Sequence, residues 1–228
     1  MKFANWIKNK SSLIPGMHDR GYRLCASDDE NHCIFYPEIR LKIFPKITLS
    51  QWDERTFRSA IILCSRDVAE EFREKDLWLD EMPGLEGNSI GVLSVELLWL
   101  RWNNNPDLMQ NYRDDYRKSF ESGCMRFFED LDTFGIPFIS SLSRPDPLAN
   151  ALENIDEYPA NIMQGGKPRS ADPFIYSAIL SMRNGEIAQA KEALKKGELK
   201  YACVNPDIEW QHRRSLNYKE RMRRILRA

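Results

Sequence analysis

Strand-like and helical patterns occupy different parts of this chain, and that segregation constrains its fold more than any other sequence feature. Up to about residue 105, short apolar runs and period-2 alternation predominate, as at Ile39, Leu41 and Ile43. Beyond it, apolar residues recur every three or four positions. Strands followed by helices are typical of α+β proteins. The sequence therefore predicts an antiparallel sheet of about four to five strands in the N-terminal half, packed by a long helix and followed by a C-terminal helical region.

Several segments of the first half carry strand signals. Residues 22–26 and 32–36 flank an acidic, turn-rich stretch and predict a β-hairpin. The alternation from Ile39 to Ile43 predicts a third strand. Residues 57–64 fit a strand or a buried helix equally well, because short apolar runs do not decide between the two. The apolar run at residues 90–102 suits a strand at the centre of a sheet.

Helical spacing predicts the first two helices. Residues 67–78 form one, with Asp67 as the N-cap and Glu70 completing a capping box. The longest predicted helix covers residues 107–132, and the sequence Phe-Gly-Ile-Pro at residues 134–137 is expected to end it.

The remaining helices define a C-terminal helical part. A loop over residues 140–146 precedes a short helix near residues 148–155. Two further helices, one from Asp172 to the Asn184-Gly185 turn and one over residues 186–196 that stops at Gly197, predict a helical hairpin. The expected organisation is an α+β body at residues 1–140 and a helical region at residues 141–228, which can also form one continuous domain.

Cysteine usage and hydropathy favour a cytoplasmic protein with no membrane partner. The five cysteines are scattered, no CxxC pair occurs, and the first ten residues lack the apolar run of a signal peptide. Reduced thiols in the cytoplasm are the simplest interpretation. The apolar stretch at residues 90–100 contains Glu96 and is far shorter than the roughly 20 residues that span a bilayer.

Charge is distributed unevenly along the chain. The formal net charge of the whole protein is −1. The segment from Gln211 to Ala228 has seven basic residues and one acid, Glu220, so it carries +6 and the rest of the chain carries −7. The basic residues are Arg213, Arg214, Lys219, Arg221, Arg223, Arg224 and Arg227. A basic tail therefore follows an acidic body, and the protein as a whole has no general attraction for nucleic acid or anionic membrane.

No motif for catalysis, cofactor binding or metal binding stands out. His32 and Cys33 are adjacent, so on a strand they point to opposite faces and do not form a zinc pair. The Gly-Gly-Lys-Pro-Arg-Ser stretch at residues 165–170 lacks the spacing of a phosphate-binding loop. We therefore expect no cofactor, no metal and no recognisable catalytic residue. An enzyme without a sequence motif remains the less favoured alternative.

The C-terminal tail is the most informative local feature. Tyr218, Met222 and Ile225 recur at helical spacing, with Leu226 beside them, so an apolar seam runs along an arginine-rich helix. Three interpretations follow: the helix docks on the body by this seam, it binds nucleic acid, or it grips an acidic protein. The candidate interaction residues are Arg213, Arg214, Tyr218, Arg221, Arg223, Arg224 and Arg227.

Two functional hypotheses remain. The first is a non-enzymatic protein-interaction module, such as an adaptor, an inhibitor or an immunity-type protein, with Trp52, Trp78 and Trp210 as candidate exposed aromatics. Its acidic body could cover a basic partner. The alternative is a nucleic-acid-binding protein whose tail arginines contact phosphates while Tyr218 stacks on a base.

Overall fold

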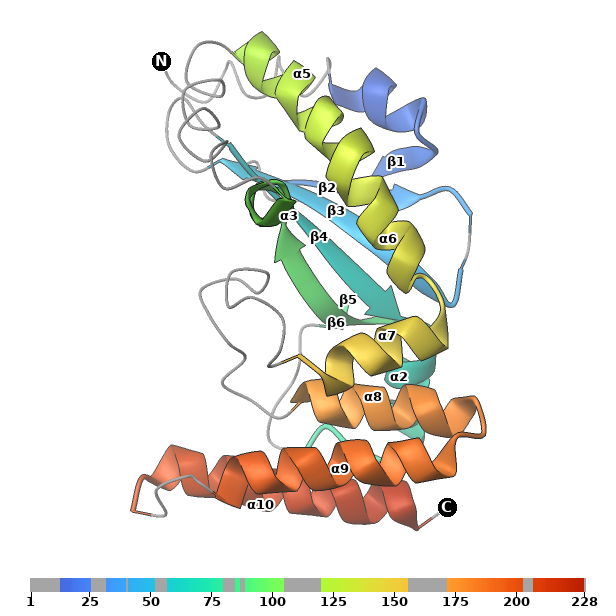
Figure 1. Ribbon diagram of the computed structural model, residues 1–228, viewed down its shortest axis with the longest axis vertical. Coiled ribbons are helices and arrows are strands. Elements are labelled where there is room, and N and C mark those ends of the chain that lie inside the picture. Colours follow the sequence, from blue (N-terminus) through green and yellow to red (C-terminus); the bar gives the residue numbers. More distant parts are fainter. Residues whose placement is uncertain are drawn as a thin grey trace. The chain divides into compact units, whose positions relative to one another are not determined.

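The protein is described here from a computed structural model, shown in Figure 1. The structure describes residues 13–25, 32–39, 41–51, 57–79, 85–86, 89–104, 120–155, 172–202 and 207–227.

The chain divides into two compact units, and each is built from several segments. The first unit takes Met1–Leu63, Ser94–Ser141 and Asn161–Gly165, and the second takes Cys64–Leu93, Leu142–Ala160 and Gly166–Ala228. The division of the chain into domains at residue 140 stays a prediction.

Six strands form one sheet in the order β1-β2-β3-β4-β6-β5 (Figure 1). Their bounds are Tyr22–Cys25, His32–Pro37, Ile43–Gln51, Phe57–Ser65, Leu85–Glu86 and Ser89–Glu96, from β1 to β6. β1 pairs antiparallel with β2, β2 with β3, and the two-residue β5 with β6. The predicted antiparallel sheet in the N-terminal half is therefore confirmed, as is the α+β class.

The predicted hairpin is confirmed, but the third strand begins later than expected. In the hairpin, Cys25 of β1 lies opposite Ile34 of β2. Ile39 and Leu41 lie before β3 and are 72% and 43% exposed, so their alternation belongs to a surface link and not to a strand. Strand β3 begins at Ile43 and is buried almost continuously, with Phe44, Ile47 and Leu49 enclosed on its two faces. A period-2 pattern alone does not show which face, if any, is covered.

The next two segments form strand β4 and helix α2. Residues 57–65 form strand β4, which settles the choice between strand and helix. Helix α2, Arg66–Glu74, is capped by Ser65, whose hydroxyl accepts a 3.3 Å hydrogen bond from the Val68 backbone N–H. Asp67 lies inside the helix and is buried, so its assignment as the N-cap was wrong by two residues.

The apolar run at residues 90–102 contains two elements instead of one strand. Strand β6 ends at Glu96, and helix α3, Leu97–Asn104, follows without a break. Leu97, Leu100 and Arg101 are buried at helical spacing. Because nearly every position in the run is apolar, the change of period from two to about 3.6 leaves no trace in its hydropathy.

The long helix is confirmed from residue 120 onward, but its predicted end is wrong. Helix α5, Phe120–Asp130, continues through a π-helical turn, Leu131–Gly135, into α6, Ile136–Leu142. The Ile136 N–H donates to the Leu131 carbonyl, which is the i→i−5 bond of a π turn. Pro137 would disturb a regular helix, and the irregular turn just before it lets the helix continue. Residues 107–119 lie outside the described part of the chain.

The C-terminal helices build most of the second unit. They are α7, Pro145–Glu153; α8, Asp172–Arg183; α9, Ile187–Ala202; and α10, Glu209–Leu226. The predicted hairpin of α8 and α9 is confirmed, and it turns at Gly185, whose φ is +84°. The expected end of α9 at Gly197 is wrong, because the helix runs on to Ala202.

Gly197 serves close packing instead of helix termination. A Cβ atom at this position would overlap the Tyr218 hydroxyl and press on Phe174 Cβ. The residue is buried at the contact between α9 and α10. Glycine is thus retained inside the helix, despite its low helix propensity, because the aromatic ring of α10 lies against the backbone of α9.

Candidate interaction surface

Helix α10 extends over 18 residues and carries the predicted basic tail. It contains no glycine or proline. Glu209 lies in its first turn, and Arg223 and Arg224 lie in its last turn, the arrangement that the helix dipole favours. The sequence prediction of a C-terminal helix is therefore correct, and what it can bind depends on which residues face inward.

The inner face of α10 packs within the second unit. Tyr218 and Ile225 are 1% and 0% exposed, and Met222 is half-buried. The Tyr218 hydroxyl donates a 2.8 Å hydrogen bond to the Leu194 carbonyl of α9. The predicted apolar seam is a docking seam, except that Leu226 lies off it and is 44% exposed. Tyr218 is therefore not placed to stack on a nucleic-acid base.

Two of the candidate arginines hold the turn that follows α2. The Arg221 side chain is 4% exposed, and its Nε donates a 2.9 Å bond to the Leu77 carbonyl. Its guanidinium carbon lies 5.8 Å from the centre of the Phe72 ring. Arg224 Nη1 lies 3.0 Å from the Asp76 carboxylate. Both arginines therefore bind groups of the same unit, so their guanidinium groups are less available to a ligand.

The turn that these arginines hold is conformationally strained. Asp76 and Leu79 have φ values of +50° and +49°, in the left-handed region that non-glycine residues rarely adopt. Lys75 adds a further link, because its Nζ donates a 3.0 Å bond to the carbonyl of Ile225 on α10. Positively charged groups at the carboxyl end of α2 also interact favourably with its dipole.

The outer face of α10 carries the basic residues that remain on the surface. Arg213, Arg223 and Arg227, three of the predicted site residues, are exposed there, whereas Arg214 is half-buried. Lys219 is also exposed. Leu216, at the centre of this face, is 54% exposed. We call Arg213, Leu216, Lys219, Arg223 and Arg227 the α10 outer face.

The prediction of site residues missed Leu216 and Lys219. Leu216 is two residues before Tyr218, which places it about 200° away around a helix and hence opposite the docked seam. That phase relation is present in the sequence. It becomes informative only when Tyr218 is known to face inward, since either apolar stripe could have been the buried one.

Glu220 balances part of the positive charge of α10. Glu220 is half-buried and pairs with Arg224, with 3.0 Å between its Oε1 and the arginine Nε. This hydrogen bond lowers the pKa of Glu220, so the carboxylate is ionised and balances an arginine that points toward α2. Glu220 also forms an ion pair with Arg223 of the outer face, with 3.7 Å between Arg223 Nη1 and Glu220 Oε2.

The other candidate residues that the structure describes do not form an accessible cluster. Among the described residues no group of three or more His, Cys, Asp or Glu side chains is placed to hold a metal ion. Glu71 of α2 is 8% exposed and forms 2.9 Å ion pairs with Lys75 and Arg183. Trp78 is half-buried and packs on Phe72 with 5.2 Å between ring centres. Trp52 and the side chain of Trp210 lie outside the described residues.

One buried ion pair lies in the first unit. Arg101 of α3 and Asp130 of α5 are 3% and 2% exposed, with 3.6 Å between Nη1 and Oδ2. Burial raises the pKa of Asp130 to about 6. A carboxyl with such a pKa can exchange protons near neutral pH. Because both side chains are enclosed, this pair affects stability more directly than chemistry on an external substrate.

Comparison with protein families, with characterised proteins and with solved structures gave no significant match. Within the described part of the chain, the helices are too short or too polar to cross a lipid bilayer.

Proposed function

We propose that this protein is an interaction module that binds an acidic protein partner through the α10 outer face. The observation that carries the proposal is the exposure of Leu216 among cationic side chains on a helix that is firmly docked by its other face. Leucine gains from burial by a partner, and the surrounding lysine and arginines select a partner of negative charge.

Rigidity supports this proposal. Tyr218 and Ile225 fix α10 in the core of the second unit, and Arg221 ties it to the turn after α2. A partner that binds the outer face therefore meets a preformed helix. Preformed surfaces lose less conformational entropy on binding than flexible tails do.

Nucleic-acid binding is the second candidate, supported by the same exposed cations. Arg213, Lys219 and Arg223 could each contact a phosphate. Two observations favour a protein partner instead. Tyr218, the proposed stacking residue, is buried, and Leu216 has no counterpart in a phosphate backbone.

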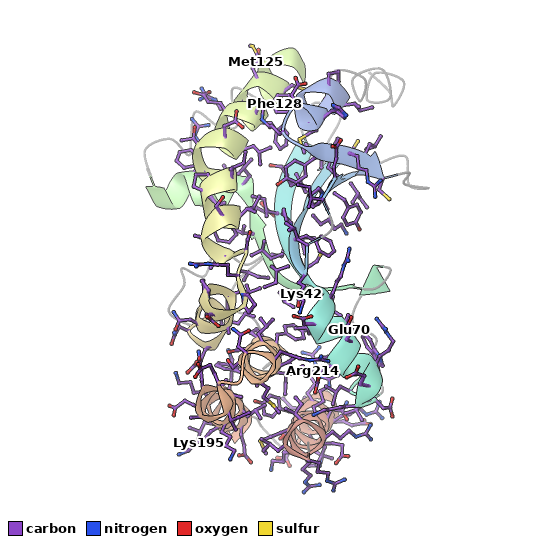
Figure 2. All side chains as sticks on the ribbon, turned by 90° about the vertical axis from the view of Figure 1, so that its right-hand side faces the viewer. Lys42, Glu70, Met125, Phe128, Lys195 and Arg214 are labelled. Atoms are coloured by element: carbon purple, nitrogen blue, oxygen red, sulfur yellow. The ribbon has the colours of Figure 1, made fainter. Side chains whose placement is uncertain are left out.

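Site-specific photocrosslinking in the cells of origin tests the proposal. A benzophenone amino acid replaces Leu216 in the full-length chain, and the same group at Met125 of α5, which is 64% exposed, serves as the control. Figure 2 labels Met125 on the outside of α5. We expect a discrete adduct of higher mass from position 216 that nuclease treatment leaves unchanged.

A charge reversal in the same experiment shows whether the adduct depends on the surface. Arg223→Glu should abolish the adduct at position 216 while the protein remains folded. A nuclease-sensitive adduct would favour the nucleic-acid alternative. An adduct of equal yield from position 125, or one indifferent to Arg223→Glu, would contradict the proposal.

A further inference from the structure

Five of the exposed residues of α10 recur at alternating intervals of four and three. His212, Leu216, Lys219, Arg223 and Leu226 follow one another in this way, and all five are exposed. This is the spacing of the a and d positions of a coiled-coil heptad. The stripe extends over about 21 Å, given a rise of 1.5 Å per residue.

The docked seam of α10 uses different residues. Tyr218, Arg221 and Ile225 are buried within the second unit and lie on the other side of the helix. The exposed stripe is therefore a second seam on a helix whose first seam is already occupied. Heptad spacing matches a second α-helix packed alongside, because it keeps the same residues in contact over several turns.

The composition of the stripe specifies the helix that would fit it. Leu216 and Leu226, 54% and 44% exposed, lie toward its two ends and require apolar side chains opposite them. Lys219 and Arg223 lie between them and require carboxylates. A second copy of α10 would place lysine and arginine against lysine and arginine, and like charges in a helix seam oppose pairing.

We propose that the partner presents an acidic amphipathic α-helix, which packs along His212, Leu216, Lys219, Arg223 and Leu226 to form a two-helix seam. This inference rests on the proposed function and narrows it to one class of partner. The partner helix carries apolar residues at the positions facing the leucines and glutamate or aspartate at the positions between them.

Synthetic peptides of about 21 residues test this proposal with full-length protein. The matching peptide is helical, with leucine at the a and d positions that face Leu216 and Leu226 and glutamate at the two seam positions between them. A scrambled peptide keeps its composition but loses the heptad spacing, and a third peptide replaces the seam glutamates with lysine. Fluorescence anisotropy measures binding to each, with a single-stranded oligonucleotide as a further probe.

Wild-type protein is expected to bind the matching peptide at least about tenfold more tightly than the scrambled one, which corresponds to about 1.4 kcal/mol. The double variant Lys219→Glu/Arg223→Glu should reverse the preference toward the lysine peptide. The matched control, Lys191→Glu/Lys195→Glu on α9, changes two exposed lysines in the same unit and should retain the wild-type preference. Figure 2 labels Lys195 on α9, and circular dichroism confirms that each variant is folded.

Three results would overturn the inference: equal binding of the matching and scrambled peptides, equal loss of binding in the α9 control, or oligonucleotide binding as tight as peptide binding. Failure here is distinguishable from failure of the proposed function. A protein adduct at position 216 without peptide binding means that the partner is not an acidic helix. Absence of both adduct and peptide binding removes the two proposals together.

Discussion

Raising the pH from about 4 to about 7 should destabilise the protein through one buried carboxyl group, that of Asp130. The group is 2% exposed at the end of α5, next to the π turn. It forms an ion pair with Arg101, with 3.6 Å between Nη1 and Oδ2. Burial outweighs the attraction of Arg101 and raises the pKa of Asp130 from 3.8 to about 6.

The sign and magnitude follow from the difference in proton binding. Between about pH 4 and pH 6 the folded protein keeps a proton on Asp130 that the unfolded chain has lost, so the free energy of unfolding falls as pH rises. The pKa in the folded protein, about 6, exceeds 3.8 by about two pH units. Each unit corresponds to about 1.4 kcal/mol, so the loss approaches about 3 kcal/mol near pH 7.

Urea denaturation followed by tryptophan fluorescence, repeated from pH 4.5 to 7.5, measures this slope. Asp130→Asn cannot titrate and should lose the part of the slope that Asp130 contributes. Asp19→Asn, which removes an exposed carboxylate in the same unit, is the control and should retain it. If Asp130→Asn retains the wild-type slope, burial does not control this carboxyl and the reasoning is wrong.

Three packing and capping predictions can be measured as changes in the free energy of unfolding by the same denaturation assay. Gly197→Ala should destabilise by about 1–2 kcal/mol, since overlap with the buried Tyr218 ring outweighs the gain in helix propensity; a stabilised variant would show that the ring can move aside. Tyr218→Phe should cost about 1–2 kcal/mol by leaving the Leu194 carbonyl without its 2.8 Å donor, and an unchanged midpoint would contradict this. Ser65→Ala should cost about 1 kcal/mol through loss of the α2 cap, and unchanged stability would show that the cap contributes nothing.

The fold class was predictable because its signals are local and repeated. The β1–β2 hairpin follows from two apolar segments around an acidic turn, and the α8–α9 hairpin follows from helical spacing around Gly185. Each signal combines a periodic pattern with a residue that breaks it. Such features need no knowledge of distant contacts.

The errors arose where a distant contact decides the local structure. Gly197 resembles a helix terminator, but it lies inside α9 because Tyr218 packs on it from 21 residues away. Pro137 resembles a stop, but the π turn before it carries the helix onward. Ile39 resembles a strand residue but is 72% exposed. In each case the residue type fits two environments, and the sequence pattern around it does not select between them.

The sequence also does not show which charges of α10 are exposed. Arg221 and Arg223 are separated by a single residue, yet Arg221 is 4% exposed and bound to the Leu77 carbonyl, while Arg223 is exposed. The number of cations in the sequence therefore overstates the charge available to a ligand. Because Tyr218 faces inward, only the cations on the opposite side of the helix face outward.

This division of roles determines which experiments on α10 are informative. Deleting the helix would remove the exposed cations, but it would also uncover the sites of Tyr218 and Ile225 and release the strained turn at Asp76. Loss of binding in a truncated chain would therefore report on folding as much as on recognition. Substitutions confined to Leu216, Lys219 or Arg223 leave the docked seam intact, so a loss of binding in those variants can be attributed to the surface itself.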